Sequence, residues 1–71
     1  MTEFKDAFGH RLKVTRIDKR LSREELAEKA EVSAASIASY EQGDKSPLFE
    51  TAYRLARALG VSPDRLCDFS T

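Results

Sequence analysis

The chain of 71 residues has little of what several classes of protein need. Its single cysteine, Cys67, cannot close a disulfide within the chain, which fits a reducing cytosol. Its apolar runs are short, so no segment is expected to span a membrane. Residues 1–6 combine acidic side chains with no long apolar stretch, which is atypical of a signal peptide. These absences predict one small cytoplasmic domain.

Residues that carry catalysis or metal binding are also scarce. His10 is the only histidine and no cysteine pair accompanies it, so no metal site is expected. There is no glycine-rich phosphate loop, and the acidic residues fall on predicted helix surfaces without a paired-carboxylate site. Cys67 lacks a neighbour that marks a nucleophile and is interpreted as a small packing residue. We therefore expect no enzyme, no cofactor, no metal and no small-molecule ligand.

Net charge is absent as well, but the charges are unevenly distributed. The chain has 12 basic and 12 acidic residues. Residues 1–23 carry a basic surplus, whereas residues 24–71 carry an acidic one. A neutral protein with this asymmetry can still present one basic face, as a nucleic-acid partner would require. On charge alone, solvation of ordinary helices is the simpler interpretation.

Every segment of the chain has helical periodicity, and no run alternates with the period of a strand. The first helix is expected at about residues 3–19, with Phe4, Phe8 and Leu12 on one stripe. Val14 and Ile17 lie off that stripe, which suggests that the first helix makes a second apolar contact with another part of the protein. Four further helices are expected, at about 23–30, 34–41 and 48–59 and from Pro63 onward. The residues of these four that carry the apolar pattern are Leu26, Ala27, Ala30, Ile37, Tyr40, Phe49, Ala52, Tyr53, Ala56, Leu59, Leu66 and Phe69. The fold class is therefore all-α, a compact five-helix bundle.

Residues that typically begin or end helices support these boundaries. Ser22, followed three residues later by Glu25, forms a capping-box pattern in which each residue satisfies a free N–H at the helix start. Ser33 is a second N-cap. Gly43 and Gly60 are natural stops, because glycine readily adopts the left-handed conformation that ends many helices.

The informative stretch is 21–43. Two short helices are joined there by about three residues, with small Ala27 and Ala30 where the helices must approach closely. This is the spacing of a helix-turn-helix, whose second helix can enter a DNA major groove. An ordinary pair of antiparallel helices within a bundle remains the alternative.

A set of fixed spacings runs through roughly residues 8–69. Its elements are Leu21-Ser22-x-Glu24-Glu25-Leu26-Ala27-Glu28-Lys29, Val32-Ser33, Ile37-x-x-Tyr40-Glu41-x-Gly43, Pro47, and Leu55-Ala56-x-Ala58-Leu59-Gly60-Val61-Ser62. In these the sequence resembles the Cro/repressor-type (XRE-like) helix-turn-helix regulators of prokaryotes and phages. The resemblance implies one lambda-repressor-like DNA-binding domain over residues 1–71, with the motif at about 22–41. It further implies a nucleoid-associated homodimer that binds a near-palindromic operator in double-stranded DNA, as a repressor of transcription.

The same resemblance implies roles for individual residues. Phosphate contacts are implied for Ser22, Arg23, Ser33 and Lys45. Contacts to bases or to the groove are implied for Ala34, Ala35, Ser36, Ser39 and Gln42. Arg16 and Glu41 match the family's structural ion pair, which ties the first helix to the end of the recognition helix.

Three departures from the family pattern bear on binding. The recognition helix is rich in alanine and has only Gln42, at its far end, as a long amide donor. We therefore expect weak or shape-dominated specificity that favours A·T-rich sites, through contacts to thymine methyl groups; Ala38 needs no explanation beyond helix propensity. Glu31 replaces the usual turn glycine, so the turn is either distorted or carries about 1 kcal/mol of left-handed strain. Asp44 stands where a cation is usual and lowers the expected affinity, which Lys45 partly compensates.

A second function is kept open. The alanine-rich helix would also suit an interaction module or antitoxin-like subunit that docks a protein partner and has weak DNA readout. The candidate dimer surfaces are the last helix, with Leu66 and Phe69, and the loop with Pro47 and Leu48. For Leu66, a place in the core is the preferred interpretation.

Overall fold

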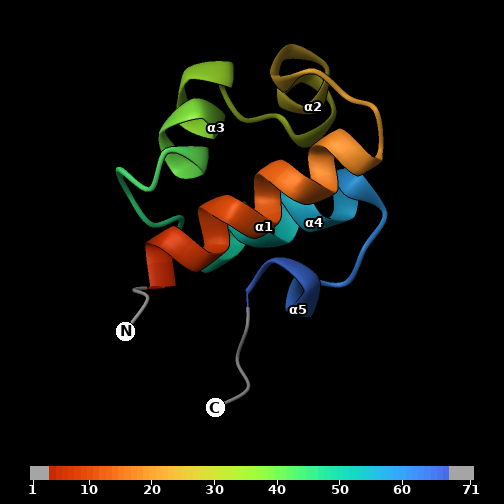
Figure 1. The fold of residues 1–71 in the computed structure, drawn as a ribbon. Coiled ribbons are helices and arrows are strands. Elements are labelled where there is room, and N and C mark those ends of the chain that lie inside the picture. Colours follow the sequence, from red (N-terminus) through yellow and green to blue (C-terminus); the bar gives the residue numbers. More distant parts are fainter. Residues whose placement is uncertain (1–3, 68–71) are drawn as a thin grey trace.

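The computed structural model describes residues 4–67 and contains, within them, five helices and no strand (Figure 1). The helices are α1 (Phe4–Asp18), α2 (Arg23–Ala30), α3 (Ala34–Glu41), α4 (Phe49–Leu59) and α5 (Pro63–Leu66). The all-α, five-helix expectation is confirmed, with boundaries within about a residue of those predicted for the first four helices. No helix in this range is both long and apolar enough to cross a membrane.

The helices enclose one core. In Figure 1, α1 crosses the middle of the molecule, with α2 and α3 on one side of it and α5 on the other. The contacts agree, since α3 packs on α1 and α2 while α4 packs on α2 and α5. All five helices and the residue after α5 supply core side chains. The buried apolar residues are Phe8, Leu12, Leu26, Ala30, Ile37, Tyr40, Ala52, Leu55, Ala56, Leu59, Leu66 and Cys67.

Gly9 lets α1 and α3 come close together. A Cβ atom at this position would collide with the carbonyl oxygen of Tyr40 and lie 3.2 Å from that of Glu41. Glycine inside a helix costs about 0.5–1 kcal/mol relative to alanine, so its place here is explained by the close approach. Beside it, the rings of Phe8 and Tyr40 meet edge to face at 6.0 Å. Sequence analysis gave Gly9 no role, although a glycine within a helical pattern was the available signal.

The helices α1 to α4 end in the same way, each at a residue with positive φ. These residues are Arg20 (59°), Glu31 (58°), Gly43 (76°) and Gly60 (73°). The N–H after each donates to the carbonyl five residues back: Leu21 to Arg16, Val32 to Ala27, Asp44 to Ser39, and Val61 to Ala56. This is the Schellman arrangement, and it confirms both glycine stops. The turn at Glu31 is therefore regular, and its left-handed strain is tolerated.

Several expected inward residues lie outside the core. Val14 and Ile17 are 51% and 54% exposed, so they form no buried second contact. Phe49 and Tyr53 are also exposed, because the buried face of α4 is set by the helically spaced Ala52, Leu55, Ala56 and Leu59. Phe4 is 45% exposed at the first turn of α1. Leu66 is fully buried, whereas Phe69 lies outside the described residues.

Replacing Glu31 with glycine should stabilise the protein. The substitution keeps the left-handed backbone and removes the Cβ that opposes it, so we expect the free energy of unfolding to rise by about 1 kcal/mol. Arg20→Gly, at the equivalent position after α1, should raise the free energy of unfolding in the same way. Urea unfolding followed by circular dichroism measures both. A loss of stability in both variants would contradict the assignment of strain to these turns.

Candidate nucleic-acid interface

The N-terminal end of α3 faces outward. The Ser33 side chain caps the helix by accepting the Ser36 N–H at 3.0 Å. The inward side of α3 buries Ile37 and Tyr40. Away from them, Ala35 is exposed and Ala34, Ser36 and Ser39 are half-buried. In Figure 1, α3 lies at the edge of the molecule.

A polar cluster surrounds this end of α3. The Ser33 hydroxyl donates to the Ser36 oxygen at 2.9 Å. Lys45, from the loop between α3 and α4, brings its Nζ to 3.4 Å from the same oxygen and 5.2 Å from the Tyr40 ring centroid. A cation over an aromatic ring is favourable, so Lys45 is held beside the helix rather than loose in the loop. The structure thus adds a positive charge where the α3 dipole already favours anions.

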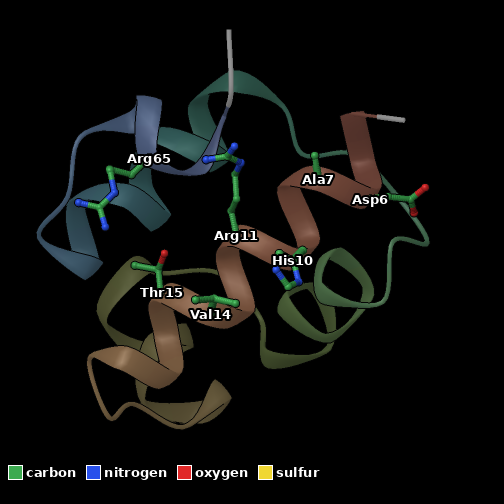
Figure 2. Close-up of a pocket in the computed structure, with 7 residues that line it drawn as sticks. All are labelled: Asp6, Ala7, His10, Arg11, Val14, Thr15 and Arg65. Atoms are coloured by element: carbon green, nitrogen blue, oxygen red, sulfur yellow. The ribbon is translucent and has the colours of Figure 1, made fainter. Parts of the chain in front are cut away.

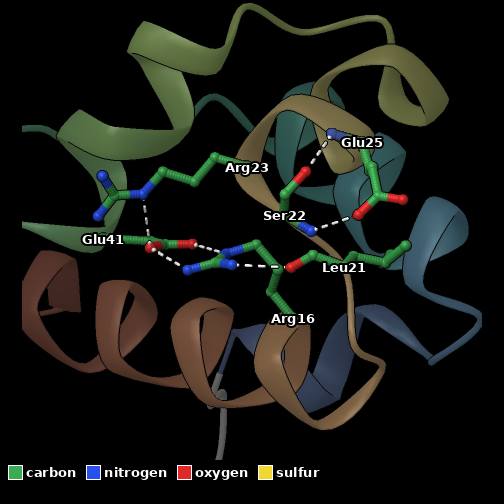
Figure 3. Close-up of polar contacts among 6 residues, drawn as sticks. All are labelled: Arg16, Leu21, Ser22, Arg23, Glu25 and Glu41. Carbon is green, nitrogen blue, oxygen red and sulfur yellow. Dashed lines mark hydrogen bonds and ion pairs between the residues drawn. The ribbon is translucent and has the colours of Figure 1, made fainter.

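The other end of α3 is held by a buried carboxylate. Arg16 donates from Nε to Glu41 Oε2 at 2.6 Å and from Nη2 to Oε1 at 3.1 Å (Figure 3). Arg23 donates from Nε to Oε1 at 3.1 Å, and the Glu41 side chain has no exposed surface. Arg16 Nη1 also donates to the Leu21 carbonyl at 2.8 Å. The expected Arg16–Glu41 pair is present and is part of a three-residue cluster that links α1, α2 and α3.

The cluster is charged at neutral pH. Burial alone would raise the pKa of Glu41, but the hydrogen bonds and charges of Arg16 and Arg23 outweigh it and hold the pKa below its ordinary value. The hydrogen bond to Glu41 raises the pKa of Arg16. Removing one partner would leave a buried charge uncompensated, so the cluster constrains the angle between the helices.

The start of α2 carries two of the expected phosphate ligands. Arg23 is engaged with Glu41 through Nε, yet 35% of its side chain is exposed. Figure 3 shows its terminal nitrogens directed away from Glu41. The Ser22 hydroxyl accepts the Glu25 N–H at 3.0 Å, and the Ser22 N–H donates to Glu25 Oε1 at 2.8 Å, which confirms the capping box. The bond from the Ser22 backbone holds the pKa of Glu25 below its usual value. Sequence reasoning missed the Arg23–Glu41 contact.

Gln42 stands apart from the polar cluster. It caps the C-terminal end of α3 and is exposed, about 13.5 Å along the helix from Ser33 by the rise of an α-helix. Asp44 is exposed just beyond it. The structure therefore brings Ser33, Ser36 and Lys45 together and leaves Gln42 at a separate point.

A groove of about 630 Å³ lies along α1, and none of the residues expected to contact DNA lines it. Its lining is Asp6, Ala7, His10, Arg11, Val14, Thr15 and Arg65, and Figure 2 shows the α1 side chains together with Arg65 of α5. Within residues 4–67, no three His, Cys, Asp or Glu side chains gather as a metal site would need. Burial, assisted by the charge of Asp64, raises the pKa of the Cys67 thiol, which suits a packing residue.

Known proteins that are similar to this chain in sequence or in structure include helix-turn-helix regulators. The helix-turn-helix family matches residues 12–66. Control protein C.BamHI of Bacillus amyloliquefaciens is 31% identical over 65 residues, which cover 90% of this chain and 80% of that protein. The restriction-modification controller C.AhdI of Aeromonas hydrophila superposes with a TM-score of 0.84 and 31% identity, over 87% of this chain and 94% of that one. The P22 c2 repressor, solved in complex with a synthetic operator, superposes with a TM-score of 0.82 and 26% identity, over 97% of this chain and 100% of that one.

Glu41→Gln should destabilise the protein and flatten its pH dependence. Because the folded-state pKa of Glu41 is lowered, its stabilisation is present above the unfolded pKa of about 4.3 and is lost as pH falls through the folded value. We expect a loss of about 3–5 kcal/mol at pH 7 and a smaller decline in stability below pH ~4.3. Denaturant unfolding between pH 3 and 7 measures both effects.

The matched control is Glu28→Gln, an exposed residue on α2, which should change stability by less than about 0.5 kcal/mol. Wild-type stability of Glu41→Gln at pH 7 would contradict the role given to the buried carboxylate.

Proposed function

The chain belongs to the helix-turn-helix family of Cro/repressor-type (XRE-like) transcriptional regulators, and we propose that it binds operator DNA as a homodimer, with the N-terminal end of α3 in the major groove. The observation that carries this proposal is the outward end of α3, surrounded by Ser33, Ser36 and Lys45. Two recognition helices about 34 Å apart would read a near-palindromic operator. The DNA-binding domain of this proposal spans residues 1–71.

Two groups of residues would contact the phosphates of the DNA backbone. Ser22 and Arg23 lie at the start of α2, and Ser33 and Lys45 lie at the start of α3. Both helix ends carry a partial positive charge that favours phosphate. The terminal nitrogens of Arg23, which point away from Glu41, would contact one phosphate while its Nε stays with Glu41. These contacts set position and affinity rather than sequence preference.

Readout of bases would be limited. In this proposal Ala34, Ala35, Ser36, Ser39 and Gln42 face the groove. Alanine side chains offer only apolar contact, for which the thymine methyl group is the natural match in the major groove. We therefore propose a preference for A·T-rich operators, with weak discrimination at each base pair.

The biological setting is proposed from the relatives. One of them is a control protein, another is a restriction-modification controller, and a third is a repressor solved with a synthetic operator. We propose a regulator of the same kind, acting as a repressor on DNA in the cytoplasm, where it would associate with the nucleoid.

One observation favours a second function. The exposed side of α3 has small side chains and, within Ala34–Glu41, no lysine, arginine, asparagine or glutamine. Such a surface suits close packing against a protein helix. In that case the chain would be an interaction module or antitoxin-like subunit, and its binding to DNA would be weak.

Mutating the two phosphate anchors together should separate these functions. For Arg23→Ala with Lys45→Ala, we expect weaker DNA binding and a salt slope reduced by about one unit for each lost contact. Fluorescence anisotropy with genomic fragments at several salt concentrations measures the slope. Arg65→Ala, on α5, is the control and should leave it unchanged. An unaltered slope in the double variant would favour the protein-partner function.

Removing thymine methyl groups should weaken binding to the selected operator. The site is first obtained by selection from a random DNA pool, and thymines opposite α3 are then replaced with uracil. Loss of one buried methyl contact should cost about 0.8 kcal/mol, or about fourfold in dissociation constant. Uracil outside the α3 contacts serves as the control. Equal affinity for the thymine and uracil operators would contradict the apolar readout.

A further inference from the structure

The exposed side of α4 carries a cluster of apolar side chains. Phe49 is 68% exposed and Tyr53 47%, and the two lie about one helical turn apart on α4, while Leu48, the N-cap residue before the helix, is 77% exposed. Single exposed apolar residues are ordinary, but adjacent large ones indicate an interaction surface. The other exposed apolar pair within residues 4–67 that lies on one helix at helical spacing is Val14 and Ile17 on α1.

Charged residues of both signs flank this apolar cluster. Glu50 is 75% exposed and pairs with Arg54 within the helix at 2.8 Å, and Arg57 is exposed one turn further on. Tyr53 and these three residues line an open groove of about 730 Å³ between α4 and the C-terminal end of α2. The α4 face therefore combines aromatic and aliphatic anchors with a polar border, which is the usual composition of a protein interface.

The order of these residues is self-complementary. Glu50 precedes Tyr53 by three residues, and Arg57 follows it by four. If two α4 helices pack antiparallel about a two-fold axis beside Tyr53, Glu50 of each copy lies opposite Arg57 of the other. Such an interface repeats each contact twice, as two-fold symmetry requires. On α1, the exposed Val14–Ile17 pair is bordered by Lys13 and Asp18 and contains no aromatic side chain, so the α4 face offers the larger apolar anchors.

We propose that a second copy of this chain packs on the α4 face formed by Leu48, Phe49, Glu50, Tyr53 and Arg57. The inference rests on the proposed homodimer and assigns its interface. It replaces the last helix as the dimer surface, since Leu66 is in the core, and retains Leu48 from the loop. Within the chain, α3 packs on α1 and α2 while α4 packs on α2 and α5. The proposed function further requires that the dimer contact leave the outward side of α3 open.

Complementary charge swaps test the pairing. Alone, Glu50→Arg and Arg57→Glu each place like charges at both ends of the interface, so we expect the dimer dissociation constant to rise at least about tenfold. Mixing the two variants places opposite charges at both contacts, so a heterodimer should form with nearly wild-type affinity. Sedimentation velocity measures the constants, and native mass spectrometry with one isotope-labelled variant identifies the heterodimer.

Controls separate pairing from folding and from general charge. Asp18→Arg and Lys13→Glu change exposed α1 residues in the same way and should leave dimerisation intact. Circular dichroism checks that each variant is folded, because Glu50→Arg also removes the pair with Arg54. Tyr53→Ser, which changes no charge, should also dissociate the dimer.

The outcomes distinguish this inference from the proposed function. Wild-type dimers that persist in both single swaps, or a mixture that forms no heterodimer, would overturn the α4 interface and leave the homodimer proposal standing. A wild-type protein that stays monomeric at all concentrations and on operator DNA would overturn both. Recovery of the heterodimer in the mixture would support the interface directly.

Discussion

The carboxylate of Glu41 is the point on which the arrangement of α1, α2 and α3 depends. It is buried, it accepts hydrogen bonds from guanidinium groups on two other helices, and Arg16 extends the link to the Leu21 carbonyl between α1 and α2. A buried charge of this kind adds little net stability, but it penalises any rotation that would leave it unpaired. The cluster therefore fixes the orientation of α3 more than it strengthens the fold.

The two halves of α3 have different tasks. Its C-terminal half is packed against α1 through the close contact at Gly9, the Phe8–Tyr40 rings and the Glu41 cluster. Its N-terminal half carries small side chains and the Ser33–Ser36–Lys45 group at the surface. Because the C-terminal half of α3 is held rigidly, the position of the N-terminal half is fixed as well. The N-terminal half carries no long side chain that would lose conformational freedom on binding. In the proposed function this compensates in part for limited readout, because a pre-organised surface loses less entropy on binding.

Much of the fold was predictable because its signals are local. The Ser22–Glu25 capping box, the Ser33 cap and the stop at Gly43 depend on residues within one turn, so sequence spacing alone indicates them. Resemblance to the family supplied the Arg16–Glu41 pair, which joins residues far apart in sequence. Periodicity failed for Phe49 and Tyr53, since an apolar pattern does not show which face of α4 a neighbouring helix covers. The Arg23–Glu41 contact required the tertiary structure, and the roles of α3 residues toward DNA stay predictions.

Glu41 and its arginine partners Arg16 and Arg23 act as one unit in this structure. A double-mutant cycle on the free energy of unfolding, with Arg16→Gln and Glu41→Gln singly and together at pH 7, tests it most directly. We predict a coupling of at least about 1 kcal/mol, because the second substitution removes a buried charge that the first has left with Arg23 as its remaining partner. Additive effects of the two substitutions, with coupling near zero, would contradict the claim.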